Sequence, residues 1–137
     1  MWQGQYETTT DVPAEKLFRV IADINCWNKW DDGVESTKLE GIARAGAAFM
    51  LKPKGGPNVH LTIDEIRPYC LVDTAHLFFA KMRTSHEYTQ KDGRTTIHFQ
   101  VEVWGVLGFF WRKVVAENQI KEAAAQTQAL IEYARHN

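Results

Sequence analysis

The chain has 137 residues, of which 45% are hydrophobic and 24% charged, as is typical of one globular domain. The formal net charge is −1 with both signs well mixed, which argues against an electrostatic surface for nucleic acid or for an anionic membrane. No stretch approaches the roughly 20 apolar residues of a membrane-spanning helix, and no signal peptide is evident. Because the two cysteines, Cys26 and Cys70, stand in no metal-like spacing, a reducing compartment is favoured and we expect a cytoplasmic protein.

The N-terminal part is predicted to form one strand followed by two helices. Residues 2–10 are rich in aromatic and β-branched side chains, which favour a strand. Asp11 is placed to cap a first helix. A second, short helix is expected over residues 24–29, where Trp27 and Trp30 stand three apart and therefore face the same way.

Six further strands are predicted, separated by turn sequences. They are expected over residues 34–40, 46–52, 58–66, 70–76, 81–90 and 94–104. The Asp92-Gly93 pair between the last two is a strong signal for a two-residue hairpin turn. Since the connections are short, consecutive strands should pair in one antiparallel sheet of seven strands.

The C-terminal segment, about residues 108–135, is predicted to be one long helix. No proline interrupts it, and one stripe at helical spacing consists of Glu117, Ile120, Ala124, Thr127 and Ile131. Such a helix must bury its stripe, and the sheet is the available partner. We therefore expect one α+β domain over residues 1–137, in which a curved seven-stranded antiparallel sheet wraps around the long C-terminal helix.

Three segments of the chain are similar to those of a known superfamily. They are Trp27-Asn28-Lys29-Trp30-Asp31, residues 46–57 (GAAFMLKPKGGP) and residues 101–108 (VEVWGVLG). With them the chain resembles the START-like or SRPBCC superfamily, whose fold is also called helix-grip or Bet v 1-like, and more closely its polyketide cyclase/dehydrase-type branch. The resemblance covers essentially the whole chain and implies the helix-grip fold. The matching motifs are turns and helix starts, so they specify the fold better than the function.

Alternation along the strands predicts which side chains face the space between sheet and helix. On each strand, the set without charged residues should point inward. On the strand 70–76 the alternation is less clear, and the uncharged set is Cys70, Val72, Thr74 and His76. The candidate ligand-binding residues are Phe49, Leu51, Leu61, Ile63, His76, Met82, Thr84, His86, Tyr88, Phe99 and Val101 from the strands, with Glu117, Ile120 and Ala124 from the helix.

A mostly apolar interior with a few polar groups is typical of a small-molecule pocket. His86 and Tyr88 have an alternative interpretation as hydrogen-bonded core residues, because buried polar groups normally find partners. An unpaired buried carboxylate is costly, so Glu117 should pair with an inward His or Arg or lie at an open end of the cavity. Phe78 and Phe79 either guard the mouth of the cavity or cap the core.

The sequence contains no recognisable catalytic motif. It has no nucleophile elbow, no close-set Cys or His ligands for zinc and no glycine-rich nucleotide loop. Neither a cofactor nor a metal is therefore expected. The partner we expect is a small apolar ligand, with no nucleic acid and no integral membrane position, and nothing in the sequence demands an oligomer.

Three functional hypotheses follow. The first is binding of a small apolar or aromatic ligand, such as a lipid, an isoprenoid or a polyketide-like compound. The second is a cyclase- or dehydratase-type enzyme, suggested by the resemblance, in which His86, Tyr88 or Glu117 moves a proton. The third is a protein–protein interaction module, which predicts a filled core and a large exposed apolar patch.

Overall fold

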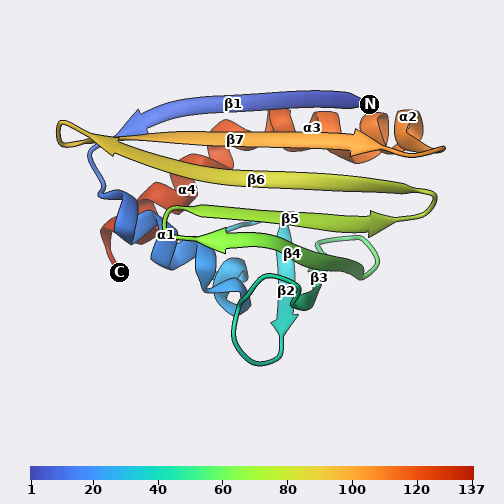
Figure 1. Ribbon diagram of the computed structural model, residues 1–137, viewed down its shortest axis with the longest axis horizontal. Coiled ribbons are helices and arrows are strands. Elements are labelled where there is room, and N and C mark those ends of the chain that lie inside the picture. The colour runs from blue at the N-terminus through green and yellow to red at the C-terminus, as the bar shows by residue number, and fades with distance from the viewer.

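Seven strands form one antiparallel sheet in the computed structural model, which describes residues 1–137 (Figure 1). The strands are β1 (Trp2–Thr10), β2 (Val34–Leu39), β3 (Ala48–Pro53), β4 (Val59–Arg67), β5 (Cys70–Leu77), β6 (Ala80–Lys91) and β7 (Arg94–Trp104). Their order in the sheet is β1-β7-β6-β5-β4-β3-β2, so the first two strands of the chain form the two edges. The predicted strands are confirmed, with ends that move by one or two residues.

Helices cover one face of this sheet. The first two are α1 (Ala14–Ala22) and the 3₁₀ helix η1 (Ile24–Lys29), and the C-terminal ones are α2 (Gly108–Trp111), the π-helical turn η2 (Arg112–Ala116), α3 (Glu117–Lys121) and α4 (Ala123–Arg135). In Figure 1 the C-terminal helices pass behind the sheet, with α2 and α3 beside β1 and β7 and α4 reaching α1. No helix is long and apolar enough to cross a membrane.

The C-terminal segment differs from the single regular helix that was expected. It widens into a π turn and then breaks at Glu122, whose φ and ψ of −93° and −1° lie outside the ideal helix. A π turn places residues five apart on the same side, and Arg112 donates to Glu117 at that spacing with an Nε–Oε2 distance of 2.7 Å. An ion pair on the widened turn thus joins η2 to α3.

The expected cap on the first helix is also wrong. Pro13 occupies the N-cap position and no side chain caps α1. The free backbone N–H of Ala14 instead donates to Gln90 Oε1 at 2.9 Å. Asp11 accepts hydrogen bonds from Arg135, at 3.0 Å for the closer pair, so the carboxylate joins the segment before α1 to the end of α4.

The hydrophobic core lies between the helices and the inner face of the sheet. Its strand residues include Phe49, Leu61, Ile63, Ile97, Phe99, Val101 and Val103, all less than 8% exposed. Trp27 fixes η1 on this face, because its indole Nε1 donates to Ile21 O at 2.8 Å and its ring meets Phe49 edge-on at 5.6 Å. At the β6–β7 turn, Asp92 and Gly93 both have positive φ, as the predicted hairpin requires.

Candidate functional site

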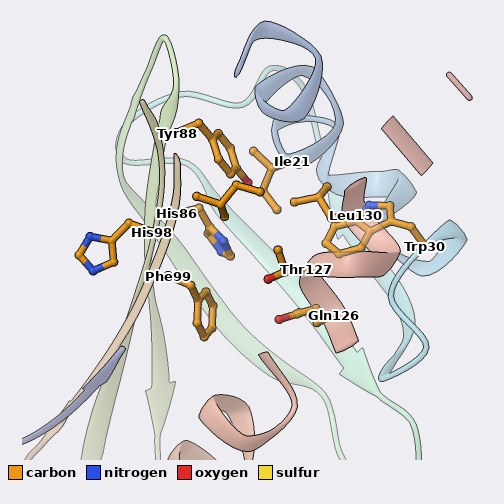
Figure 2. Close-up of a pocket in the computed structure, with 10 residues that line it drawn as sticks. Ile21, Trp30, His86, Tyr88, His98, Phe99, Gln126, Thr127 and Leu130 are labelled. Carbon is orange, nitrogen blue, oxygen red and sulfur yellow. The ribbon is translucent and has the colours of Figure 1, made fainter. Parts of the chain in front are cut away.

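A small cavity lies between the sheet and α4. Residues from α1, the end of η1, β6, β7 and α4 line it, namely Ile21, Trp30, His86, Tyr88, Ile97, Phe99, Gln126, Thr127 and Leu130 (Figure 2). Its volume is about 20 Å³, which is room for about one water molecule. Figure 2 shows His98 on the far side of the strands, where its ring meets Gln5 Oε1 at 2.9 Å, so His98 belongs to the outer face.

A polar contact holds α4 against the segment that follows η1. Gln126 Nε2 donates at 2.6 Å to Oδ2 of Asp31, the residue directly after Trp30. Asp31 also accepts from the backbone N–H of Gly33 at 2.9 Å, which fixes the carboxylate. The contact therefore joins α4, which lines the cavity, to the residue that follows Trp30 on its other side.

Two polar atoms at the cavity have no hydrogen-bond partner in the protein. They are the Tyr88 hydroxyl and Trp30 Nε1, and both side chains are less than 10% exposed. Burial raises the pKa of Tyr88, so its hydroxyl stays neutral and can donate. A buried polar group without a partner costs about 1–3 kcal/mol, so both atoms favour a ligand that supplies an oxygen acceptor.

His86 lies on the same wall as Tyr88, two residues earlier on β6. Its ring packs between Phe99, at 5.4 Å between centroids, and Trp27, at 6.5 Å. Burial lowers the pKa of His86 to about 4, so the imidazole is neutral near pH 7. Neither His86 nor Tyr88 makes a side-chain hydrogen bond to another protein group, so no partner within the protein supports their alternative interpretation as hydrogen-bonded core residues.

Asp73 on β5 is the polar residue that sequence reasoning missed. It is 3% exposed and lies on the inner face between Ile63 of β4 and Thr84 of β6. Burial, helped by the charge of Asp64, raises the pKa of the Asp73 carboxyl to about 8. Near neutral pH this side chain is therefore a protonated acid that can donate a hydrogen bond.

The predicted inward set of β5 is accordingly wrong. His76 is exposed on the outer face, where its Nε2 lies 2.8 Å from Thr62 Oγ1. The inward positions are those of Leu71, Asp73 and Ala75, of which Leu71 is fully buried. A rule that excluded charged residues from the interior selected the other face. The alternating apolar side chains of Leu71 and Ala75 were the signal that could have identified it.

The positions predicted for the residues of the C-terminal helix are also confirmed only in part. Ala124 is exposed, and Glu117 is half-buried outside the cavity, where Arg112 and Lys113 lower its pKa by hydrogen bonding. Ile120 is half-buried over β1, where a methyl group added at Gly4 would come within 2.8 Å of its Cγ1. The buried stripe consists of Ala116, Ala123, Thr127, Leu130, Ile131 and Ala134, so the stripe is centred one residue earlier than predicted.

The remaining predicted site residues lie on the inner face of the sheet. Phe49, Leu61, Ile63, Met82, Tyr88, Phe99 and Val101 are buried, and Leu51, Thr84 and His86 are half-buried. Of these, only His86, Tyr88 and Phe99 reach the cavity itself. The others fill the core around it, and their contact with a ligand stays a prediction.

The inner face thus combines an acid and a base that are both uncharged. Strand register pairs Leu71 with His86 and Asp73 with Thr84, so Asp73 and His86 are diagonal neighbours on adjacent strands. Such neighbours stand about 7–8 Å apart. A protonated carboxyl can donate to a carbonyl oxygen, and a neutral imidazole can accept a proton.

The sequence matches the protein family described as "Polyketide cyclase / dehydrase and lipid transport" over residues 1–135. No curated protein matches it.

Solved structures share the fold. The crystal structure of Ara h 8.0201 superposes with a TM-score of 0.80 at 20% identity, over 99% of each chain. A START superfamily protein from Mycobacterium smegmatis gives a TM-score of 0.75 at 12% identity, over 96% of this chain and 97% of its own. The Zhui aromatase/cyclase from a Streptomyces species gives 0.75 at 13% identity, over 98% and 93%. At these identities the likeness shows the helix-grip fold alone.

Proposed function

Since the chain belongs to the polyketide cyclase/dehydrase and lipid transport family, we propose that it binds a small apolar or aromatic molecule between the sheet and the C-terminal helix. The observation that carries this proposal is a pair of unpartnered polar atoms, the Tyr88 hydroxyl and Trp30 Nε1, on residues that line a mostly apolar cavity. The Tyr88 hydroxyl and Trp30 Nε1 offer two donors, and the neutral His86 ring offers a donor and an acceptor. These groups would orient a ligand that carries a carbonyl or hydroxyl group.

A ligand larger than one water molecule must widen the cavity, because its volume is about 20 Å³. Among the C-terminal helices, α3 has no fully buried residue, and it packs against β1 outside the cavity. Leu51, Val59 and Leu77 are half-buried apolar residues on the three strands β3, β4 and β5. A ligand that extends from the cavity over these residues would gain apolar contacts on the inner face of the sheet.

Native mass spectrometry and thermal shift against fatty acids, isoprenoids and aromatic polyketide-like compounds test the proposal. A ligand that binds only the folded protein raises the melting temperature as its concentration rises. We expect Tyr88→Phe to weaken that shift, whereas Tyr69→Phe, which changes an exposed tyrosine, leaves it intact. Binding that is equally strong in both variants, or no binding by any compound class, would contradict the proposal.

A second function, of the cyclase or dehydratase type, is favoured by the raised pKa of Asp73 beside a neutral His86. In such a step His86 would take a proton from the carbon next to a carbonyl group. The electron pair would move to the carbonyl oxygen, and Asp73 would protonate that oxygen to give the enol. Asp73 would then take back the enol proton, the returning electron pair would expel the β-hydroxyl, and the proton held by His86 would go to that hydroxyl, which leaves as water.

The two functions separate when binding and turnover are measured on the same variants. With a β-hydroxy ketone of the polyketide type as probe, His86→Gln and Asp73→Asn should each lower turnover by about 100-fold or more. Both variants should still give a thermal shift with the same probe. Turnover that survives both substitutions would remove the enzymatic alternative and leave ligand binding in place.

A further inference from the structure

Large apolar side chains are exposed at one end of the molecule. Nine large hydrophobic residues are exposed in all, and six of them fall on the β5–β6 turn, the β7–α2 loop and the helical turns that follow. We call these six residues the aromatic tip: Phe78, Phe79, Val106, Phe109, Phe110 and Val114. Phe78 is 69% exposed, Phe79 62% and Phe109 71%. Side chains so exposed contribute little to the core.

The two loops of the aromatic tip form one surface. Trp111 Nε1 donates to Phe78 O at 2.8 Å, and the backbone N–H of Leu107 donates to Phe79 O at 3.0 Å. Gly105 permits this approach, because an added Cβ would lie 2.8 Å from Phe79 O. In Figure 1 the β5–β6 turn and the β7–α2 loop lie at the same end of the sheet, beside α2.

Folding does not explain the residue at position 79. The backbone of Phe79 has φ of 54°, in the left-handed region where glycine and asparagine are favoured and a bulky side chain is strained. Its ring is also 62% exposed to water. An aromatic residue at a strained, exposed position lowers stability in two ways, which points to a role outside the fold.

The tip is suited to an apolar medium. Backbone groups that enter such a medium must already be hydrogen-bonded, and the carbonyls of Phe78 and Phe79 are both satisfied within the protein. These two carbonyl groups therefore need no water to complete their bonding. Paired aromatic rings, such as Phe78 and Phe79 at 4.4 Å, offer a large apolar surface for insertion.

The charge around the tip is positive, although the whole chain carries −1. Residues 77–83 and 103–116 contain Lys81, Arg83, Arg112 and Lys113 and no carboxylate. Arg83 pairs with Asp64, and Glu117 is shared by Arg112 and Lys113. Glu102 also lies opposite Arg83 in the β6–β7 pair, so three carboxylates offset four cations and the local excess is one positive charge. Whole-chain composition hid this distribution, which is complementary to an anionic surface.

We propose that the aromatic tip inserts into the surface of an anionic lipid bilayer, with the neighbouring cations on the lipid headgroups. Apolar insertion combined with electrostatic attraction is how peripheral proteins hold a membrane without spanning it. This goes beyond the proposed function, because ligand binding in the cavity does not require a membrane. Along the chain, α3 directly follows the tip, and it packs against β1.

Co-sedimentation with vesicles of equal parts phosphatidylcholine and phosphatidylglycerol tests the proposal. The wild-type protein should bind these vesicles, bind pure phosphatidylcholine more weakly and release as salt increases. Phe79→Asn and Phe109→Ser should each lower the apparent affinity by about tenfold. The control is Ile42→Ser, which removes an apolar side chain that is 82% exposed in the β2–β3 loop, and it should bind like the wild type.

Phe79→Asn also separates membrane binding from damage to the fold. Because asparagine suits the left-handed backbone, the melting temperature of this variant should equal or exceed that of the wild type. Absence of vesicle binding by the wild type would overturn the proposal. So would equal losses in Ile42→Ser and Phe109→Ser. A wild-type dimer in light scattering that Phe109→Ser converts to a monomer, without any vesicle binding, would assign the tip to a second copy of the chain and refute membrane docking.

Discussion

Asp73, His86 and Tyr88 each hold an uncharged polar group on the apolar inner face of the sheet. In all three, burial disfavours the charged form, which raises the pKa of the acid and the phenol and lowers that of the base. No hydrogen bond within the protein compensates the Tyr88 hydroxyl. Burial of these groups costs stability, and the proposed function would give them a role in orienting a ligand.

Replacing Asp73 should change how stability depends on pH. Its pKa is raised from 3.8 to about 8 in the folded protein, so the unfolded state loses its proton first as the pH rises. The stability that the protonated form contributes is fully present below pH 3.8 and is lost as the pH rises through about 8. Relative to Asp73→Asn, which does not titrate, the wild type should lose up to about 1.4 kcal/mol per pH unit in that window.

Urea unfolding of both proteins across this range measures the difference. His86 contributes a pH dependence of the opposite sign. Its pKa is lowered from 6.5 to about 4 in the folded protein, so the stability that it contributes is lost as the pH falls from 6.5 through 4. Because His86 is present in both proteins, this contribution cancels in the comparison. Curves that stay parallel from acid to alkaline pH would show that Asp73 does not titrate abnormally.

Removing the Tyr88 hydroxyl should not harm the protein when no ligand is bound. A buried hydroxyl without a partner costs free energy, so Tyr88→Phe should leave the free energy of unfolding unchanged or raise it by about 1 kcal/mol. Chemical denaturation checks this value. A loss above about 1 kcal/mol would mean that the hydroxyl is held by a partner, such as an ordered water molecule.

At the scale of elements, strand positions were predictable and strand faces were only partly so. Turn sequences such as Asp92-Gly93 mark the strand ends locally, which is why the boundaries agree within two residues. The face of β5 was misassigned because Asp73 is a charged residue type that the fold buries in its neutral form. The break at Glu122 and the π turn could not be predicted, since they depend on how the helices pack against β1 and β7.

The segment α2–α3 should open more readily than α4. Gly108 and Ala116 are the only fully buried residues between positions 108 and 121, whereas α4 buries five. Few buried contacts mean a small free energy of local opening. In native-state hydrogen exchange, amides of α3 should exchange about tenfold faster, or more, than those of α4. Equal protection along both would contradict the expectation that few buried contacts let α3 open more readily than α4.

The junction between β7 and α2 should tolerate no side chain at Gly105. An added Cβ would lie 2.7 Å from the backbone of Ala80, and φ at Gly105 is +116°. Gly93→Ala is the matched control, because Gly93 also has positive φ, +78°, but no neighbour within 4 Å. By chemical denaturation, Gly93→Ala should cost about 1 kcal/mol and Gly105→Ala about 2 kcal/mol more. Equal costs would show that the close approach is absent.

For the whole molecule, the helix-grip architecture was predictable because strand order, short links and a final helix permit few arrangements. The site was less predictable. Alternation along β6 and β7 placed His86, Tyr88 and Phe99 inside, but Trp30 and Gln126 reach the cavity only through packing between distant segments. The exposure of Phe78 and Phe79 likewise follows from loop geometry, which residue types alone do not encode.

The most direct test of ligand binding in the cavity follows the indole N–H signals of the five tryptophans by NMR. Trp30 Nε1 is unpartnered, whereas the indoles of Trp27 and Trp111 already donate to backbone carbonyls. During titration with a compound that binds in thermal shift, the signal lost in Trp30→Phe should move downfield as its proton gains an acceptor, while the Trp27 and Trp111 signals move much less. A bound compound that leaves the Trp30 signal in place would contradict the account, because the ligand would then lie outside this cavity.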